Sequence, residues 1–206
     1  MIYVEFCVEG VMPLLLHRME DSDLTKGGIR SNTPAEPDDP RNVAEKAAYR
    51  LPSGQLALPG TAFLRLTREA GANHKLKGMR KAAKSLVPAA VIVLDDLCGL
   101  CLKDRKTPIM TFEVDSRSGV NNTTHARVMI HRPKMHEWTC KVHLRINEKV
   151  LPESFIRLLL SEGGEQIGIG SFRPEKGGSF GIFDVVSWEV VAPAMKSTPA
   201  REHAAA

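Results

Sequence analysis

Segments of strand-like hydrophobicity alternate along this chain with two helix-forming segments, and this order limits the folds it can adopt. Residues 2–9 carry an apolar side chain at every second position, which is the period of a half-buried strand. Similar alternation or short apolar runs predict further strands at 86–94 and 97–102, 109–115, 138–147 and 179–191.

Two helices are predicted between these strands. The first runs over residues 62–70, with Thr61 as its cap and Gly71 as a left-handed stop. The second starts with Pro152 as its first residue and ends at Gly163. Two helices that are each placed between strands predict an α+β fold, namely a ferredoxin-like, RRM-like βαββαβ core with loop and hairpin insertions. Such a sheet leaves one face free for nucleic acid.

The length of 206 residues fits one domain, which we expect to span residues 1–192. Residues 18–48 are rich in Pro, Gly, Asp and Asn, which predicts a loop insertion that holds a short helix near its end. The polar stretch 116–137 predicts a projecting hairpin or loop, and the tail 193–206 is expected to be disordered.

Positive charge is concentrated in the middle of the chain. Residues 61–149 have a net charge of +9, although the whole chain has only +4. No acidic residue lies between Glu69 and Asp95, and that interval holds the cluster Lys75, Lys77, Arg80, Lys81 and Lys84. Uncompensated positive charge favours a polyanionic partner, although a merely solvated basic loop is the alternative.

Residues 163–183 are the stretch richest in glycine, and they include Arg173 and Lys176. Gly168-x-Gly170 follows a predicted helix and lacks the third glycine of a dinucleotide-binding motif, so that reading is rejected. A main chain of this kind can approach a sugar-phosphate backbone closely, although tight packing alone could also require the glycines.

The projecting segment 116–137 offers Arg127, His131, Arg132 and Lys134 to line a groove for a phosphate backbone. Aromatic residues make up only 5% of the chain, so an extended platform for base stacking is poorly supported. Phe172 and Phe180 are the best stacking candidates, whereas Trp138 and Trp188 are interpreted as core residues. Recognition would therefore rest on phosphates and shape.

Two motifs together resemble the RAMP superfamily, the RNA-binding proteins of CRISPR effector complexes. Pro59, Gly60, Thr61 and Arg68 match a segment of that family that follows a short strand and begins the first helix. Where the family often has a lysine, this chain has Leu64, with Arg65 next to it. The second motif resembles the family's glycine-rich loop before the last strand, and it comprises Gly168, Gly170, Arg173, Gly177, Gly178 and Gly181. The chain is also similar to small phage-encoded proteins.

The resemblance is closest to the backbone subunit that polymerises along the guide RNA, and it implies a non-catalytic, largely sequence-independent binder of single-stranded RNA. Such a protein would form a homo-oligomer or filament along the strand, together with other effector subunits. The residues expected to contact nucleic acid are Arg65, Arg68, Lys75, Lys77, Arg80, Lys81, Arg127, His131, Arg132, Lys134, Gly168, Gly170, Phe172, Arg173, Lys176, Gly177 and Gly178.

Two alternatives stay open at this point. His17 follows the first strand, where nucleases of the wider superfamily often have a catalytic histidine, so a metal-independent endoribonuclease is one of them. The other is a phage protein that binds single-stranded DNA or another protein.

No cofactor or metal is expected. Cys98-x-x-Cys101 is a single pair inside an apolar run, without a second pair at zinc spacing, and is interpreted as core thiols. No apolar run is long enough to span a membrane, and the N-terminus lacks the basic region of a secretory signal. With few cysteines as well, the sequence favours a cytoplasmic protein.

Overall fold

The computed structural model describes residues 1–18, 39–76, 82–120 and 127–192. Its central sheet has the strand order β3-β5-β8-β1-β9, and β4 also pairs with β8. Every pairing in this sheet is antiparallel. The strands are β1 (Ile2–Gly10), β3 (Ala57–Pro59), β4 (Val91–Val93), β5 (Leu97–Cys101), β8 (Thr139–Ile146) and β9 (Phe183–Val191).

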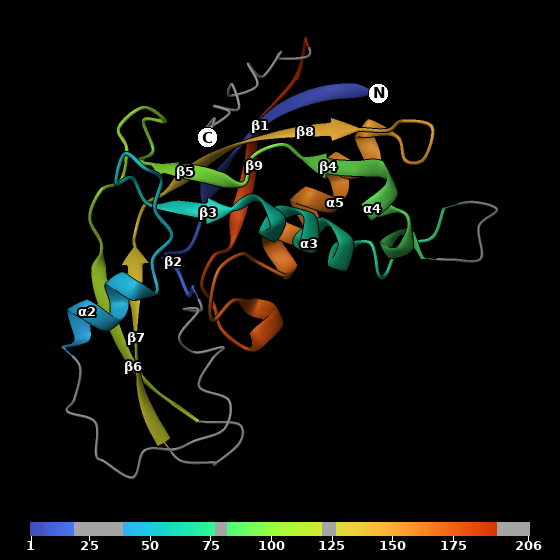
Figure 1. The fold of residues 1–206 in the computed structure, drawn as a ribbon. Coiled ribbons are helices and arrows are strands. Elements are labelled where there is room, and N and C mark those ends of the chain that lie inside the picture. Colours follow the sequence, from blue (N-terminus) through green and yellow to red (C-terminus); the bar gives the residue numbers. More distant parts are fainter. Residues whose placement is uncertain (19–38, 77–81, 121–126, 193–206) are drawn as a thin grey trace, which may run out of the picture.

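Two helices pack against one face of the sheet and against each other (Figure 1). They are α3 (Gly60–Ala70), which precedes β4, and α5 (Glu153–Gln166), which joins β8 to β9. The chain order of these elements and the position of β1 and β8 at the centre of the sheet are those of a βαββαβ core. The predicted α+β, ferredoxin-like fold is confirmed.

The second strand of that plan is divided into β4 and β5. At the break, the Asp95 carboxylate accepts hydrogen bonds from the backbone N–H of His143, at 2.8 Å, and lies 2.9 Å from its Nδ1. The prediction of one strand over 86–94 was wrong in its first half, because residues 83–85 form the short helix η1 and Val87–Ala90 form α4. Pro88 is tolerated there because the first turn of a helix does not use its N–H groups.

The helix α3 ends at Ala70, as predicted, but its start and its capping residues differ from the sequence expectation. The helix starts at Gly60, and Thr61 does not cap it, because Pro59 is the N-cap and no side-chain hydrogen bond closes that end. A Cβ on Gly60 would lie 1.9 Å from the Asp95 carbonyl oxygen, so this glycine permits a close approach between the helix and the β4–β5 break. Gly71 has φ −67° and therefore is not a left-handed stop.

Gly163 does not end the second helix, because α5 continues through it to Gln166, and Pro152 precedes the helix as its N-cap. A Cβ on Gly163 would lie 2.4 Å from Leu66 Cδ2, and one on Gly164 would lie 2.4 Å from the Phe183 carbonyl oxygen. Both glycines therefore allow α5 to approach α3 and β9 closely, at some cost in helix propensity.

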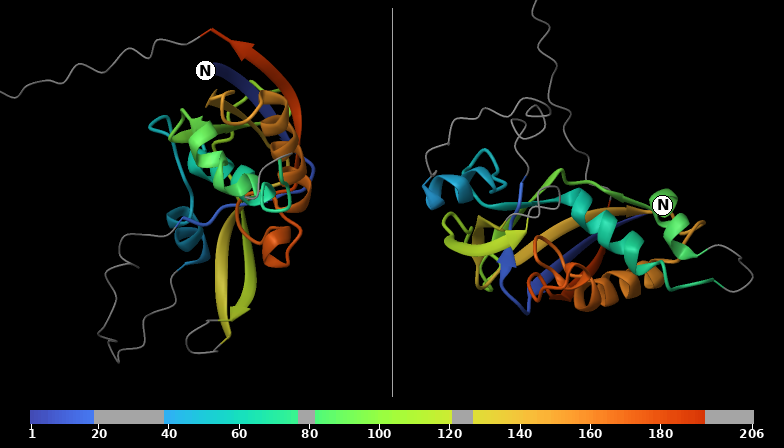
Figure 2. Two further views of the ribbon diagram at one scale, coloured as in Figure 1. Left: turned by 90° about the vertical axis from the view of Figure 1, so that its right-hand side faces the viewer. Right: turned by 90° about the horizontal axis from the view of Figure 1, so that it is seen from below.

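A long hairpin extends away from the central sheet (Figures 1 and 2). It consists of β6 (Glu113–Val120) and β7 (Arg127–Met135), and β2 (Leu14–Leu15) joins it as a third strand. The helix α2 (Pro40–Lys46) packs at its base, where the Arg41 guanidinium lies 4.1 Å from the centre of the Phe112 ring. The polar stretch 116–137 therefore holds most of a hairpin that starts at residue 113. The tail 193–206 and most of the 18–48 insertion lie outside the described residues.

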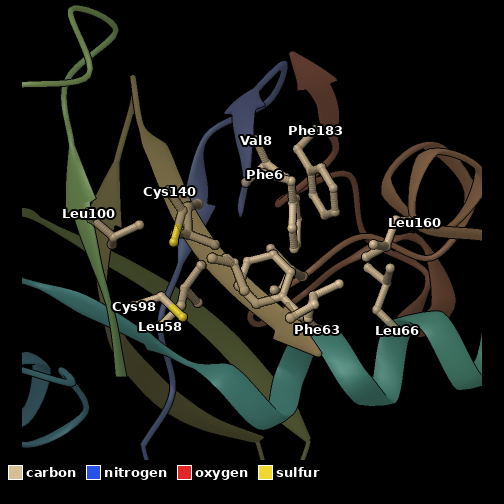
Figure 3. Packing of buried hydrophobic residues seen from close by; sticks show 14 of the residues in the cluster. Phe6, Val8, Leu58, Phe63, Leu66, Cys98, Leu100, Cys140, Leu160 and Phe183 are labelled. Atoms are coloured by element: carbon tan, nitrogen blue, oxygen red, sulfur yellow. The ribbon is translucent and has the colours of Figure 1, made fainter. Parts of the chain in front are cut away.

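The core lies between the sheet and the two helices (Figure 3). Phe63 of α3 makes edge-to-face contacts with Phe6 and Phe183, at ring-centre distances of 5.8 and 6.2 Å. Trp138 is fully buried and Trp188 packs against Phe6. The four cysteines are free thiols. Cys98 points into the core, as interpreted from the sequence, whereas Cys101 is only half-buried and its Sγ accepts a hydrogen bond from Gln55 at 3.4 Å. This core fixes the start of α3 and the glycine-rich loop relative to each other.

Candidate nucleic-acid interface

A cleft of about 400 Å³ lies between α3, the chain just after β2 and the glycine-rich loop. Its lining includes four cationic side chains and two carboxylates: Arg65, Arg132, Arg173, Lys176, Glu69 and Glu175. His17 and Tyr49 also line it. The structure thus brings together residues that are far apart in sequence into a cleft with an excess of positive charge.

The glycine-rich loop offers main-chain donors to this cleft. Gly168, Gly170 and Phe172 all have positive φ, of 70°, 78° and 54°. Alternating conformations of this kind turn backbone N–H groups toward a common centre, where an anion can bind. The backbone N–H groups of Gly170 and Phe172 have no hydrogen-bond acceptor among the described residues.

Gly170 is needed both for its conformation and for its lack of a side chain. A Cβ at this position would lie 2.5 Å from the Leu15 carbonyl oxygen, and that carbonyl accepts a hydrogen bond from the N–H of Ser171 at 2.7 Å. The loop is therefore held directly against β2. The packing explanation of the glycines therefore applies to Gly170, and the ligand explanation stays a prediction.

Arg132 of β7 lies in the cleft without a partner in the described parts of the chain. Its Nε is buried and makes no hydrogen bond there, and no ion pair involves its guanidinium. Burial lowers the pKa of Arg132, an effect that nearby Asp115 opposes and Arg117 reinforces. An arginine in such surroundings needs an acceptor, because a buried donor without one costs free energy. The cleft therefore offers a donor that the oxygen of an anion could satisfy.

Arg65 and Arg173 both bind Glu175. The Arg65 Nη2 lies 2.9 and 3.0 Å from the two carboxylate oxygens, and the Arg173 Nε lies 2.9 Å from Oε2. Arg173 also donates to the Gly170 carbonyl at 2.8 Å, and only 12% of its side chain is exposed. Burial raises the pKa of Glu175, but the hydrogen bonds from Arg173 and the charges of Arg173, Arg65 and Lys176 outweigh it, so that the pKa lies below its ordinary value.

Phe172 and Phe180 lie at the side of the loop that faces the hairpin. Their ring centres are 6.4 Å apart, and the Arg117 guanidinium lies 4.5 Å from the centre of the Phe180 ring. Phe180 is buried, whereas 42% of Phe172 is exposed. Phe172 is therefore the aromatic ring of this pair that a base could reach.

Several of the residues expected to contact nucleic acid lie outside the cleft. Arg68 lies near Lys84 on the neighbouring surface, and Lys134 pairs with Glu113. His131 forms a hydrogen bond with Ser116 on the hairpin, and Arg127 is exposed nearer its tip. Lys75 forms an isolated bridge with Ala82, and Gly177 and Gly178 follow η2 (Pro174–Lys176). Lys77, Arg80 and Lys81 lie outside the described residues.

The sheet face opposite the helices carries a different set of charges. Strand alternation directs Glu5, Lys141 and His143 to this face, since Phe6, Val142 and Leu144 are buried on the other. Glu5 pairs with Lys141 at 2.7 Å and with His143 at 3.1 Å. The hydrogen bond from Lys141 lowers the pKa of Glu5, and the same bond raises the pKa of Lys141. Glu5, Lys141 and His143 satisfy one another. Arg145 lies on the same face, and its buried Nε, like that of Arg132, has no partner among the described residues.

Three features of the cleft were missed by the sequence reasoning: the carboxylates of Glu69 and Glu175 and the ring of Tyr49. The sequence could have pointed to Glu175, because this acidic residue lies between two cationic residues, Arg173 and Lys176. Within the described ranges, no group of three or more His, Cys, Asp or Glu side chains could hold a metal ion, and no helix could span a membrane.

Comparison with known proteins shows similarity in structure only. No family model matches this chain, and no curated protein matches its sequence. Among solved structures, a chain from the cryo-EM structure of the Type III-B Cmr-beta bound to cognate target RNA superposes with a TM-score of 0.54 and 12% sequence identity. That match covers 92% of this chain and 61% of the other, so this chain spans about three fifths of that neighbour's length.

The chain therefore shares the fold of that Cmr-beta chain. Two further structures match less well. Cmr6 from Pyrococcus furiosus has a TM-score of 0.45 and 10% identity, over 89% of this chain and 97% of that one. A Type IV-B CRISPR complex chain has a TM-score of 0.40 and 15% identity, over 95% of this chain and 94% of that one. The fold that the sequence resemblance implies is confirmed by the similarity to the Cmr-beta chain.

Proposed function

We propose that this protein binds single-stranded RNA, with little dependence on base sequence, as a subunit of a CRISPR-type effector assembly. The observation that carries the proposal is the Arg132 guanidinium, which lies in the cleft without a partner among the described residues, together with unpaired loop N–H groups. A phosphodiester supplies the acceptor oxygens and the negative charge that these groups need.

The protein would hold the RNA backbone along the cleft. Arg132, Lys176 and the N–H groups of the glycine-rich loop bind phosphates, and Phe172 stacks against one base at the rim. These contacts are to phosphates and to the face of a base, so they carry little sequence information. The RAMP-type fold and the known RNA-bound neighbour support this assignment.

The test is binding of fluorescent single-stranded RNA over a range of salt concentrations. Each phosphate contact contributes about 0.7 to the slope of log K against log salt for a single strand, so contacts from Arg132, Lys176 and Arg65 predict a slope of about −2. A slope near zero would contradict the proposed binding of RNA phosphates. Competition with single-stranded DNA of equal length and sequence separates RNA from DNA binding, and we expect RNA to compete better.

We further propose that several copies assemble side by side along one strand. The hairpin β6–β7 extends beyond the core and provides surface for contact with a neighbour (Figure 2). Mass measurements of complexes with RNAs of increasing length test this. The number of bound copies should rise in steps with RNA length, and a constant single copy would contradict the assembly.

A second candidate function is metal-independent RNA cleavage by His17. The observation that favours it is that His17 lines the same cleft as Arg132 and Arg65. An imidazole near a bound backbone can act as a general base toward a 2′-hydroxyl, and the arginines would stabilise the developing negative charge. Incubation of RNA with the protein in EDTA, in parallel with a His17→Ala variant, tests it. Cleavage that is lost in the variant would establish the enzyme, and intact RNA in both would exclude it.

A further inference from the structure

The carboxylate of Glu175 lies between two arginines that come from different elements. Arg65 belongs to α3, whereas Arg173 belongs to the glycine-rich loop. Glu175 Oε2 receives donors from both, at 2.9 Å from Arg65 Nη2 and from Arg173 Nε, while Oε1 receives Arg65 Nη2 at 3.0 Å. One carboxylate thus takes up the charge-assisted hydrogen bonds of two guanidinium groups on opposite walls of the cleft.

A phosphate in the position of the Glu175 carboxylate would be bound by the same two guanidinium groups. Guanidinium groups bind carboxylates and phosphates through the same donor geometry. The bridge is accessible to a competing anion, because 51% of the Arg65 side chain and 28% of the Glu175 side chain are exposed. Arg173 is mostly buried and is anchored independently by the Gly170 carbonyl, so it stays in place if Glu175 leaves.

We propose that Arg65 and Arg173 form a second phosphate subsite, in which the Glu175 carboxylate is an internal substitute that RNA displaces. This inference rests on the proposed RNA-binding function. Arg132 and the loop N–H groups bind a first phosphate without competition. A neighbouring phosphate of the same strand then exchanges with Glu175, so a ligand that presents linked phosphates binds better than a single phosphate does.

The exchange makes Glu175 a residue that limits affinity. Glu175→Gln removes the negative charge and keeps the size of the side chain, so Arg65 becomes available to the RNA. We expect RNA affinity to rise about two- to fivefold at low salt, which is the range of an exposed ion pair. The slope of log K against log salt should change little, because RNA that displaces Glu175 already places a phosphate on Arg65 in the unmodified protein.

The matched control is Glu162→Gln. Glu162 lies in an adjoining pocket that also includes Glu175, but it pairs with His74 rather than with an arginine of the cleft. This variant loses the same unit of negative charge in the same region. If a general change in electrostatic potential caused the gain, both variants would bind RNA equally tightly, and that result would overturn the inference.

A second substitution shows whether the gain depends on Arg65. In the double variant Arg65→Gln, Glu175→Gln the affinity gain should disappear, because the freed guanidinium is absent. If Glu175→Gln does not fold, Glu175→Asp takes its place in the test. This variant keeps the negative charge but shortens the side chain, so its gain in RNA affinity should be smaller. Unchanged or weaker RNA binding in the folded Glu175 variants would overturn the inference.

The failure of this inference can be distinguished from failure of the proposed function. If the unmodified protein binds RNA with a salt-dependent affinity and Glu175→Gln does not bind more tightly, only the subsite is wrong. If neither protein binds RNA at any salt concentration, the RNA-binding function and the subsite are both wrong.

Discussion

Asp115 and Arg132 lie opposite each other in the β6–β7 register, yet they form no ion pair. The Asp115 carboxylate instead accepts hydrogen bonds from Arg117, at 2.7 and 2.9 Å. Arg117 thus binds the Asp115 carboxylate, and Arg132 stays available in the cleft for another anion. This selection between two arginines on one hairpin is the structural basis of the RNA-binding proposal.

Replacement of Arg132 should weaken RNA binding without lowering the stability of the folded protein. Arg132→Gln should weaken RNA binding about ten- to hundredfold, because a charge-assisted hydrogen bond contributes about 1.5–3 kcal/mol. The melting temperature should stay the same or rise, because the variant removes a half-buried charge without a partner. Binding titrations and thermal unfolding measure the two effects. Lys149→Gln is the control. Lys149 is exposed on the β8–α5 connection, and its substitution also removes one positive charge.

Two glycines with similar φ provide a test of the loop. Gly170 has φ +78° and a Cβ there would meet the Leu15 carbonyl, whereas Gly177 has φ +75° and open space around it. Gly177→Ala should cost about 1 kcal/mol from the left-handed conformation alone. Gly170→Ala should cost more, about 2–4 kcal/mol, because overpacking against Leu15 adds to the backbone strain, and it should also abolish RNA binding because the loop shifts. Equal losses in denaturant unfolding would contradict the conclusion that the contact of Gly170 with β2 stabilises the loop.

The exposed ring of Phe172 should contribute to RNA affinity. Stacking of one base is worth about 1–3 kcal/mol, so Phe172→Ala should weaken RNA binding about five- to hundredfold. Since stacking is insensitive to salt, the slope of log K against log salt should not change. A loss of affinity accompanied by a shallower slope would instead indicate that the loop backbone had moved away from the phosphates.

The Glu175 bridge should make stability depend on pH in a defined direction. The pKa of Glu175 is lowered in the folded protein from the ordinary value of 4.5. Its contribution is therefore fully present well above pH 4.5 and is lost as the pH falls through the lower folded-state pKa. The stability difference between the unmodified protein and Glu175→Gln should be constant near neutral pH and should disappear in acid. A difference that grows on acidification would contradict the assignment.

Apolar periodicity predicted the βαββαβ order well, because burial on one face determines the spacing of residues such as Phe6 and Val142. Gly163 misled the prediction of a helix end, because a glycine that permits close packing looks in sequence like one that stops a helix. Gly71 does mark the end of α3, although its conformation is not left-handed. The charged residues were the hardest to assign. Arg132 and Arg117 have the same residue type and lie on the same hairpin, and only their three-dimensional competition for Asp115 distinguishes them.

Crosslinking of bound RNA tests the central claim most directly. Ultraviolet irradiation of the complex with single-stranded RNA, followed by mass spectrometry of the peptides, identifies which surface contacts the strand. We predict crosslinks in residues 167–176, with Phe172 prominent, and in the part of β7 around Arg132. Crosslinks confined to the opposite sheet face, around Tyr3, Lys141 and His143, would contradict the claim that the cleft holds the RNA.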